Sequence, residues 1–126
     1  MRFKIYYHHT DCGGVVYYAN YLKFLEEART EFLAEKGISV QELARQDALF
    51  VVARQEIDYK LPAFYADTLE VDTHVSAVGG ARVEFDYEIR NQNNQIVSKA
   101  KTTLVFVDKS LRPKVIPEEI RKLILS

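Results

Sequence analysis

The sequence predicts a single α+β domain in which a five-stranded antiparallel sheet wraps around one long helix. Three observations lead to this prediction. The chain has 126 residues, about the size of one domain, so residues 1–126 form one unit. Only residues 16–36 carry a long apolar stripe with helical spacing. Most of the other long segments alternate polar and apolar side chains, as strands do. Because one face of the sheet must be covered, the helix has to lie against it.

The first half of the chain predicts a strand, a loop and two helices. Residues 2–8 alternate as a strand with Phe3, Ile5 and Tyr7 on one face, and residues 9–14 form a polar loop with two glycines. Gly37 ends the long helix. A capping box of Ser39 and Glu42 then starts a short helix that ends near residue 46. The apolar stripe of the long helix consists of Tyr21, Leu22, Leu25, Ala28, Phe32 and Leu33.

The second half predicts four strands and a terminal helix. The strands cover residues 49–60, 68–78, 82–90 and 95–107, and Gly79-Gly80 makes a hairpin turn between the second and the third. Pro117 takes the first position of the last helix, with acidic residues in its first turn. The sheet edges are long and lack proline, which favours pairing with another subunit.

Composition excludes several classes of protein. Hydrophobic residues make up 48% of the chain and charged residues 28%, as in globular domains. The formal net charge of −1 offers no broad cationic surface for nucleic acid. No apolar run approaches the roughly 20 residues of a transmembrane helix, and the N-terminus does not resemble a secretion signal. With Cys12 as the only cysteine, an internal disulfide is impossible. We therefore expect a soluble cytoplasmic protein.

The loop before the long helix concentrates the residues that could carry chemistry. His8, His9, Asp11 and Cys12 are followed directly by the glycine pair Gly13-Gly14. Glycines allow close approach of a ligand to the backbone, and free N–H groups at a helix start favour developing negative charge. Asp11 beside such donors could act as a base or as a nucleophile. A glycine pair before a helix is also common in loops without any chemical role.

The same loop allows other interpretations. Cys12 could be a nucleophile with His8 or His9 as its base, although an isolated cysteine is more often inert. The histidines, Asp11 and Cys12 match no recognised metal-ligand spacing, so neither a metal nor a bound cofactor is expected. His74 lies on the polar face of its strand and is expected to be solvated.

Two longer motifs stand out in the sequence. The first is Tyr7-x-x-Thr10-Asp11-x-x-Gly14-Val15-Val16-Tyr17-Tyr18-Ala19-Asn20-Tyr21-Leu22, followed by Glu27-Ala28-Arg29. The second is Ile57-x-Tyr59-x-x-Pro62-Ala63-x-x-x-Asp67-x-Leu69-x-Val71. Both resemble the 4-hydroxybenzoyl-CoA thioesterase family, and most closely its YbgC-like branch of bacterial acyl-CoA thioesterases, and the resemblance spans essentially the whole chain. It implies a hotdog fold, a homodimer or homotetramer with active sites at subunit interfaces, and a cytoplasmic location.

The resemblance also implies roles for individual residues. Asp11 matches the catalytic carboxylate, and the backbone N–H of Tyr18 matches the donor that holds the thioester oxygen. Gly14 permits the close approach, and Tyr7 matches a recurrent tyrosine near the site. His8 and His9 stand where the branch usually has an acidic pair, and many members carry a histidine at the position of Tyr18. These differences leave the preferred acyl group and the optimum pH open.

The remaining assignments concern substrate binding. Val16, Tyr17 and Tyr21 are candidates for lining the acyl pocket, and Arg82 is the main candidate for contacting the phosphates of CoA, with Lys99 and Lys101 as weaker options. We expect hydrolysis of short- to medium-chain or aromatic acyl-CoA to free acid and CoA. The alternative is a non-catalytic hotdog module that binds acyl-CoA or acyl carrier protein.

Overall fold

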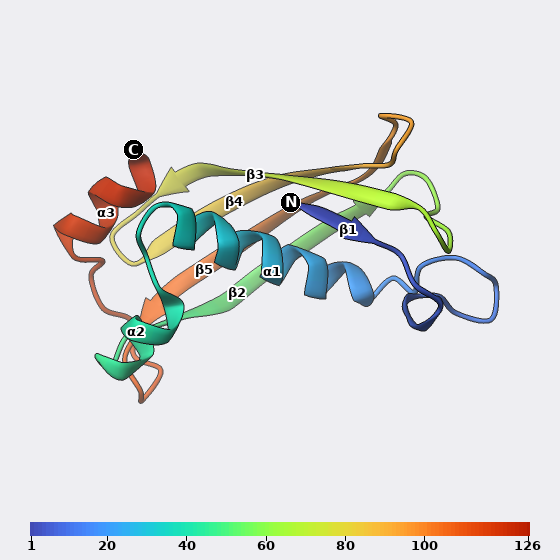
Figure 1. Cartoon of the computed structure of the whole chain (residues 1–126). Coiled ribbons are helices and arrows are strands. Elements are labelled where there is room, and N and C mark those ends of the chain that lie inside the picture. Colours follow the sequence, from blue (N-terminus) through green and yellow to red (C-terminus); the bar gives the residue numbers. More distant parts are fainter.

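The computed structural model describes residues 1–126, and in it one antiparallel sheet curls around one long helix (Figure 1). The spatial order of the strands is β1-β3-β4-β5-β2. The predicted architecture of five strands around a central helix is confirmed. The strands are β1 (Arg2–Lys4), β2 (Leu49–Tyr59), β3 (Thr68–Val78), β4 (Arg82–Arg90) and β5 (Ile96–Val107), and the helices are α1 (Asn20–Glu35), α2 (Val40–Arg45) and α3 (Glu118–Leu125).

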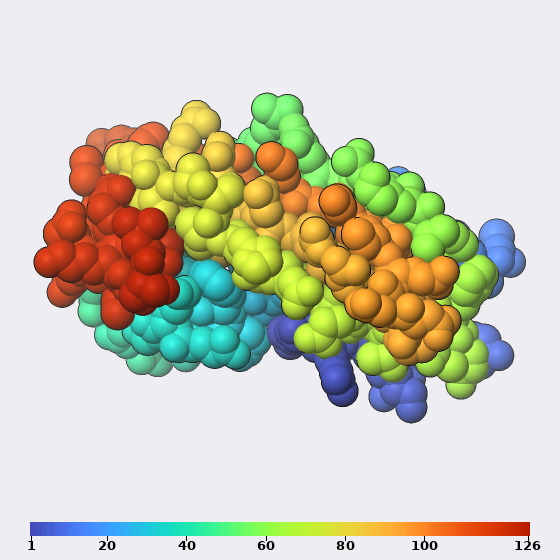
Figure 2. Space-filling view, turned by 90° about the horizontal axis from the view of Figure 1, so that it is seen from above, coloured from blue at the N-terminus to red at the C-terminus, as the bar shows by residue number.

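The core lies between α1 and the concave face of the sheet. On β4 the side chains of Val83, Phe85, Tyr87 and Ile89 are all buried, so the alternation in the sequence identifies the inner face correctly. From α1, Leu25 packs into the same core. Burial of each such side chain contributes about 1.5–3 kcal/mol to the free energy of unfolding. Figure 2, seen from above, shows α3 at one end of the molecule and the N-terminal segment toward the other.

The predicted start of the long helix is wrong. Residues 16–19 are not helical, because the backbone of Val16 is bonded elsewhere: its N–H donates to the carbonyl of Ala63 at 2.8 Å, and it pairs with Thr10. The helical stripe also differs in two residues. Leu22 is 45% exposed, whereas Phe24, absent from the predicted stripe, is buried. Pro117 precedes α3 as its cap rather than occupying its first turn.

The first strand is shorter than predicted. It ends at Lys4, and Tyr7–His9 form a turn of 3-10 helix instead. Side chains compete there with strand pairing: the hydroxyl of Thr10 donates to the carbonyl of Tyr7 at 2.7 Å, and Nδ1 of His9 accepts from the N–H of Tyr6 at 2.9 Å. Phe3 and Ile5 therefore face the core as predicted, but Tyr7 is 73% exposed.

The sheet has a long open edge along β2. β1 is three residues long, whereas β2 has eleven residues and pairs with β5 on one side only. Val52 lies opposite Leu104, a core residue, yet it is 50% exposed because nothing covers the outer edge of β2. None of the helices is both long and apolar enough to cross a membrane.

Candidate active site

The loop that contains Asp11 is a small closed hairpin at one end of the sheet. Thr10 pairs with Val16, and the N–H of Asp11 donates to the carbonyl of Val15 at 2.9 Å. Val15 in turn pairs with Phe64, which fastens the hairpin to the segment after β2. These contacts hold Cys12 and the glycine pair at an exposed tip.

The carboxylate of Asp11 has a fixed orientation although it is exposed. Its Oδ1 accepts a hydrogen bond from the N–H of Gly13 at 2.8 Å. The N–H of Gly14 donates to the Asp11 carbonyl at 3.1 Å, and Gly14 has a φ of +81°, which favours glycine. The turn therefore uses one glycine to orient the carboxylate and the other to reverse the chain.

The chain returns from this tip beside Asp11. The N–H of Tyr17 and the side-chain amide of Asn20 both donate to the carbonyl of His9, at 2.8 and 2.7 Å. The neighbouring hydroxyl of Tyr18 raises the pKa of Tyr17 above its ordinary value, and the negative charge of Asp11 adds to this rise. The start of α1 and the Asp11 loop thus form one surface.

The backbone N–H of Tyr18 is free. It donates no hydrogen bond within the chain, and neither does the N–H of Ala19, whereas the N–H of the preceding Tyr17 is used. The carbonyl of Tyr18 is anchored, since it accepts from the N–H of Tyr21 at 3.2 Å and from the hydroxyl of Tyr59 at 3.3 Å. A fixed and unused donor at a helix start is the arrangement that an oxyanion site requires.

Val16 and Tyr21 are core residues beside the site and do not line an open surface. Both are buried. Tyr21 packs edge-on against Tyr59 with ring centroids 5.4 Å apart, and burial, assisted by the charges of Tyr59 and Asp67, raises its pKa to about 12. Tyr17 is exposed, so it is the one predicted pocket residue with a free surface in a single chain.

Exposed aromatic side chains surround the loop. Tyr7 stacks on Tyr65 with ring centroids 4.0 Å apart, and both are largely exposed. Sequence reasoning missed Tyr65 and Tyr59, although Tyr59 stands in the second motif. Such an aromatic surface marks a ligand or subunit contact. Its members are Tyr7, Tyr17, Tyr18, Tyr59, Phe64 and Tyr65.

Cys12 is not paired with a histidine. It is exposed, and no hydrogen bond joins it to His8 or His9. The ring of His9 instead lies edge-on to Phe24 of α1, with centroids 5.3 Å apart, and His8 lies beside it. Both imidazoles line a cavity that Cys12 does not reach. No cluster of three or more His, Cys, Asp or Glu side chains is suitably arranged to hold a metal ion.

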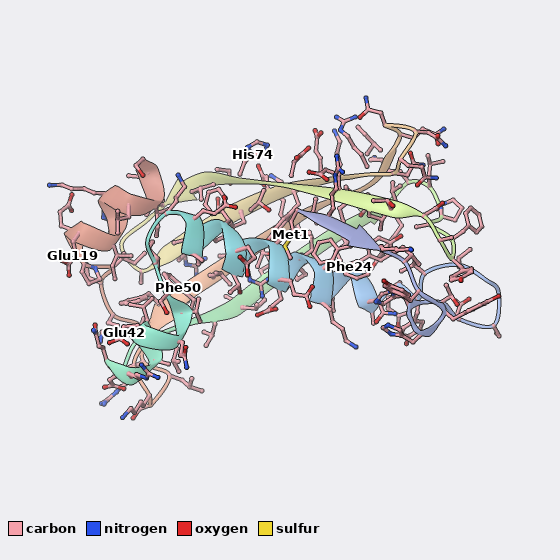
Figure 3. The ribbon with its side chains drawn as sticks, in the orientation of Figure 1. Met1, Phe24, Glu42, Phe50, His74 and Glu119 are labelled. Atoms are coloured by element: carbon pink, nitrogen blue, oxygen red, sulfur yellow. The ribbon has the colours of Figure 1, made fainter.

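The structure separates Arg82 from the loop within one chain. Arg82 begins β4, whereas the loop adjoins the other end of the sheet, near Arg90 (Figure 1). At about 3.4 Å per residue these two ends of β4 are about 27 Å apart. Lys99 and Lys101 lie on the outer face of the sheet, beside Glu88 and Asp86 respectively. His74 is on this outer face too and points away from α1 (Figure 3).

Comparisons with known proteins agree with this fold and loop. The family model described as Thioesterase-like superfamily matches residues 7–124. The acyl-CoA thioesterase YbgC of Haemophilus influenzae is 40% identical over 120 residues, covering 94% of this chain and 88% of the relative. The acyl-CoA thioester hydrolase YbgC of Escherichia coli O6:H1 is 36% identical over 118 residues, covering 93% and 88%.

A solved structure supports the same assignment. The 1,4-dihydroxy-2-naphthoyl-CoA thioesterase from Synechocystis superposes with a TM-score of 0.92 at 25% identity, covering all of this chain and 94% of that one. The predicted hotdog fold is confirmed by this similarity and by the sheet around α1. The chain belongs to the thioesterase-like superfamily and, within it, to the YbgC-like branch.

Proposed function

We propose that this protein is an acyl-CoA thioesterase, which hydrolyses an acyl-CoA to the free acid and CoA. The observation that carries the proposal is that one loop and the helix start it leads into hold both an oriented carboxylate, on Asp11, and the free backbone N–H of Tyr18. The family assignment supports the reaction class. An acyl-CoA substrate and a single exposed, unpaired cysteine both favour a location in the cytoplasm.

The chemistry requires one base and one oxyanion donor. Asp11 takes a proton from a water molecule, whose oxygen attacks the thioester carbonyl. The N–H of Tyr18 stabilises the oxyanion that forms, a contribution of roughly 2.7–4 kcal/mol for a well-placed donor. The tetrahedral intermediate collapses by breaking the C–S bond. The leaving thiolate receives the proton, so water is divided between the acid and CoA.

Asp11 can also act as the nucleophile. In that route its carboxylate attacks the carbonyl and expels the thiolate, and water then hydrolyses the mixed anhydride. The free N–H of Tyr18 serves both routes equally. Hydrolysis in H₂¹⁸O distinguishes them under single-turnover conditions, because only the nucleophilic route can leave ¹⁸O in the Asp11 carboxylate.

The acyl group we propose is short to medium in length or aromatic. The support is the aromatic surface around the loop, in which the stacked rings of Tyr7 and Tyr65 offer a flat apolar contact. Tyr17 lies on the same surface. Rates over a panel of acetyl-, hexanoyl-, benzoyl- and palmitoyl-CoA test this preference. Fastest turnover of palmitoyl-CoA would contradict it.

The active form we propose is a homo-oligomer, a dimer or a tetramer. β2 presents an unpaired edge of eleven residues, and an edge of this length is normally covered in a stable protein. The exposed aromatic surface lies at the Tyr59 end of the same strand. A second subunit along β2 would cover both, and would complete the pocket around Asp11.

The central experiment compares wild type with Asp11→Asn on the acyl-CoA panel, with released thiol as the readout. The amide keeps the shape of the side chain and can still accept from Gly13, but it cannot take a proton. Loss of turnover in a folded variant supports the proposal. Wild type that binds acyl-CoA without hydrolysing it would instead favour a non-catalytic binding module, for acyl-CoA or for acyl carrier protein.

A further inference from the structure

A cavity lies between β1, the turn at Tyr7–His9 and the first half of α1. Its volume is about 530 Å³. Phe3 and Phe24, whose rings are 4.8 Å apart, are the buried residues among those that line it. Figure 3 labels Phe24 on α1, close to β1. Nothing in the mechanism proposed for Asp11 uses this cavity.

The rim of this cavity is rich in basic side chains. Arg2, Lys4, His8 and Lys23 all line it, against one carboxylate, that of Glu27. The whole chain has a net charge of −1, so this local excess is a particular feature of the cavity. The cavity therefore suits an anion.

Two of these cations are available to a ligand. Arg2 is engaged, since its Nε lies 3.2 Å from Oε2 of Glu70. Lys4 and Lys23 form no ion pair within the chain. Burial, and then the positive charges of His8 and Lys23, lower the pKa of His9 below its ordinary value. Around the cavity, basic side chains outnumber the one lining carboxylate, that of Glu27, and Lys4 and Lys23 remain unpaired.

The rim also carries a flat aromatic surface. The rings of Tyr6 and His8 are nearly parallel, at an angle of 10° with centroids 6.2 Å apart. Nζ of Lys4 lies 5.7 Å from the centre of the Tyr6 ring. An exposed aromatic ring beside free ammonium groups is a combination that binds nucleotides, because the base stacks while the phosphates pair with the cations.

The cavity lies within reach of the candidate active site. His8 and His9 line it, and Thr10 and Asp11 follow directly in the chain. At 3.8 Å between successive Cα atoms, Asp11 Cα is at most about 11 Å from that of His8. One elongated substrate can therefore occupy both places, with a charged end in the cavity and its thioester at Asp11.

We propose that this cavity binds the 3′-phosphorylated ADP end of CoA, with Lys4 and Lys23 contacting the phosphates and Tyr6 facing the adenine. The proposal rests on the proposed thioesterase function. It gives Lys4 and Lys23 the role for which sequence reasoning favoured Arg82. The signal in the sequence is weak, because Lys4 and Lys23 are nineteen positions apart and meet only when β1 lies beside α1.

The test compares substrates that differ only at the nucleotide end. Wild type and the Lys4→Gln/Lys23→Gln double variant are assayed with one acyl group carried on CoA, on dephospho-CoA and on pantetheine. Lys122→Gln, a neutralised lysine on α3, is the matched control. In the double variant, kcat/KM for the CoA ester relative to the pantetheine ester should fall roughly tenfold or more, mainly through KM. For the dephospho-CoA ester, kcat/KM relative to the pantetheine ester should fall less.

Other results would overturn the proposal. An unchanged ratio in the double variant, or an equal loss with the pantetheine ester, removes any role in phosphate binding. If the CoA-to-pantetheine ratio falls in Arg82→Gln and not in the double variant, the nucleotide binds near Arg82 of a second subunit instead. If wild type hydrolyses none of the esters, calorimetric titration with CoA and with pantetheine decides the matter separately. The proposed nucleotide site is then retained only if CoA binds and the double variant weakens that binding.

Discussion

The Asp11 carboxylate and the backbone N–H of Gly13 are joined by a hydrogen bond of 2.8 Å. A Cβ atom at residue 13 would lie 3.2 Å from the same carboxylate oxygen, closer than an ordinary contact. Gly13 therefore both orients the carboxylate and leaves room for it. At Gly14, by contrast, a Cβ would meet nothing within 4 Å, and the constraint is the positive φ of +81°.

This difference predicts separate effects at the two glycines. Gly13→Ala should displace the carboxylate and lower kcat roughly ten- to a hundredfold, since a misplacement of about 1 Å can have that effect, with little change in stability. Gly14→Ala should lower the free energy of unfolding by about 1 kcal/mol through its left-handed backbone. Steady-state kinetics and urea unfolding measure both. A Gly13→Ala enzyme with wild-type kcat would refute the positioning role.

Cys12 is predicted to be dispensable. It is exposed and has no histidine partner, so Cys12→Ala should change kcat/KM by no more than about twofold, as surface substitutions usually do. The assay is hydrolysis of the preferred acyl-CoA, with wild type treated with a thiol-alkylating reagent alongside. A hundredfold loss in Cys12→Ala would favour the thiol nucleophile over Asp11.

His9 is predicted to make the folded protein sensitive to acid. Its Nδ1 accepts a hydrogen bond from Tyr6, and burial and neighbouring charges lower its pKa. Below its ordinary pKa of about 6.5, the unfolded chain binds this proton more readily than the folded one. The free energy of unfolding should therefore fall as the pH drops from about 6.5 toward the lower pKa of the folded state.

Urea unfolding at pH 7.5 and at pH 5.5 measures this effect. The loss between the two pH values should be smaller in His9→Gln than in wild type, because glutamine does not titrate. His74→Gln, which removes an exposed histidine from the outer face of the sheet, should retain the wild-type loss. An identical loss in all three proteins would show that His9 does not contribute.

The open edge of β2 predicts a subunit interface. Val52 faces the concave side of the sheet opposite Leu104 but remains half-exposed. Val52→Lys should raise the dissociation constant of the oligomer roughly tenfold or more, the equivalent of losing one buried valine. Val115→Lys is the matched control, since Val115 is 73% exposed and belongs to the segment between β5 and α3 rather than to β2. Sedimentation velocity over a range of protein concentrations measures the dissociation constant of wild type and of both variants. A wild-type monomer would contradict the interface.

The sequence predicts the strands better than the loop. β3 spans Thr68–Val78 as expected, and β4 keeps its alternation because inner side chains such as Phe85 and Tyr87 dominate its energetics. The 3-10 turn at Tyr7–His9 was not predictable from periodicity, since it depends on one hydrogen bond donated by the Thr10 hydroxyl and one accepted by the His9 imidazole. These are local contacts that override the alternating pattern.

The candidate site, too, has a part that the sequence predicts and a part that it does not. The order of residues around Asp11 identifies the loop, because its carboxylate, glycines and helix start are contiguous. Tyr65 stacks on Tyr7, and Lys4 and Lys23 line one cavity, although the members of each pair come from segments far apart in the sequence. Only the path of the chain brings such residues together. The free N–H of Tyr18 likewise depends on which neighbouring donors the fold uses.

The most direct test of the proposed role of Asp11 is the rate of acyl-CoA hydrolysis by Asp11→Asn beside wild type, at equal concentrations of folded protein. Removing a positioned base typically lowers the rate 10²–10⁴-fold. We expect a loss of about that size on the preferred acyl-CoA, with the unfolding transition and the oligomeric state unchanged. An Asp11→Asn enzyme that keeps most of the wild-type rate would contradict it.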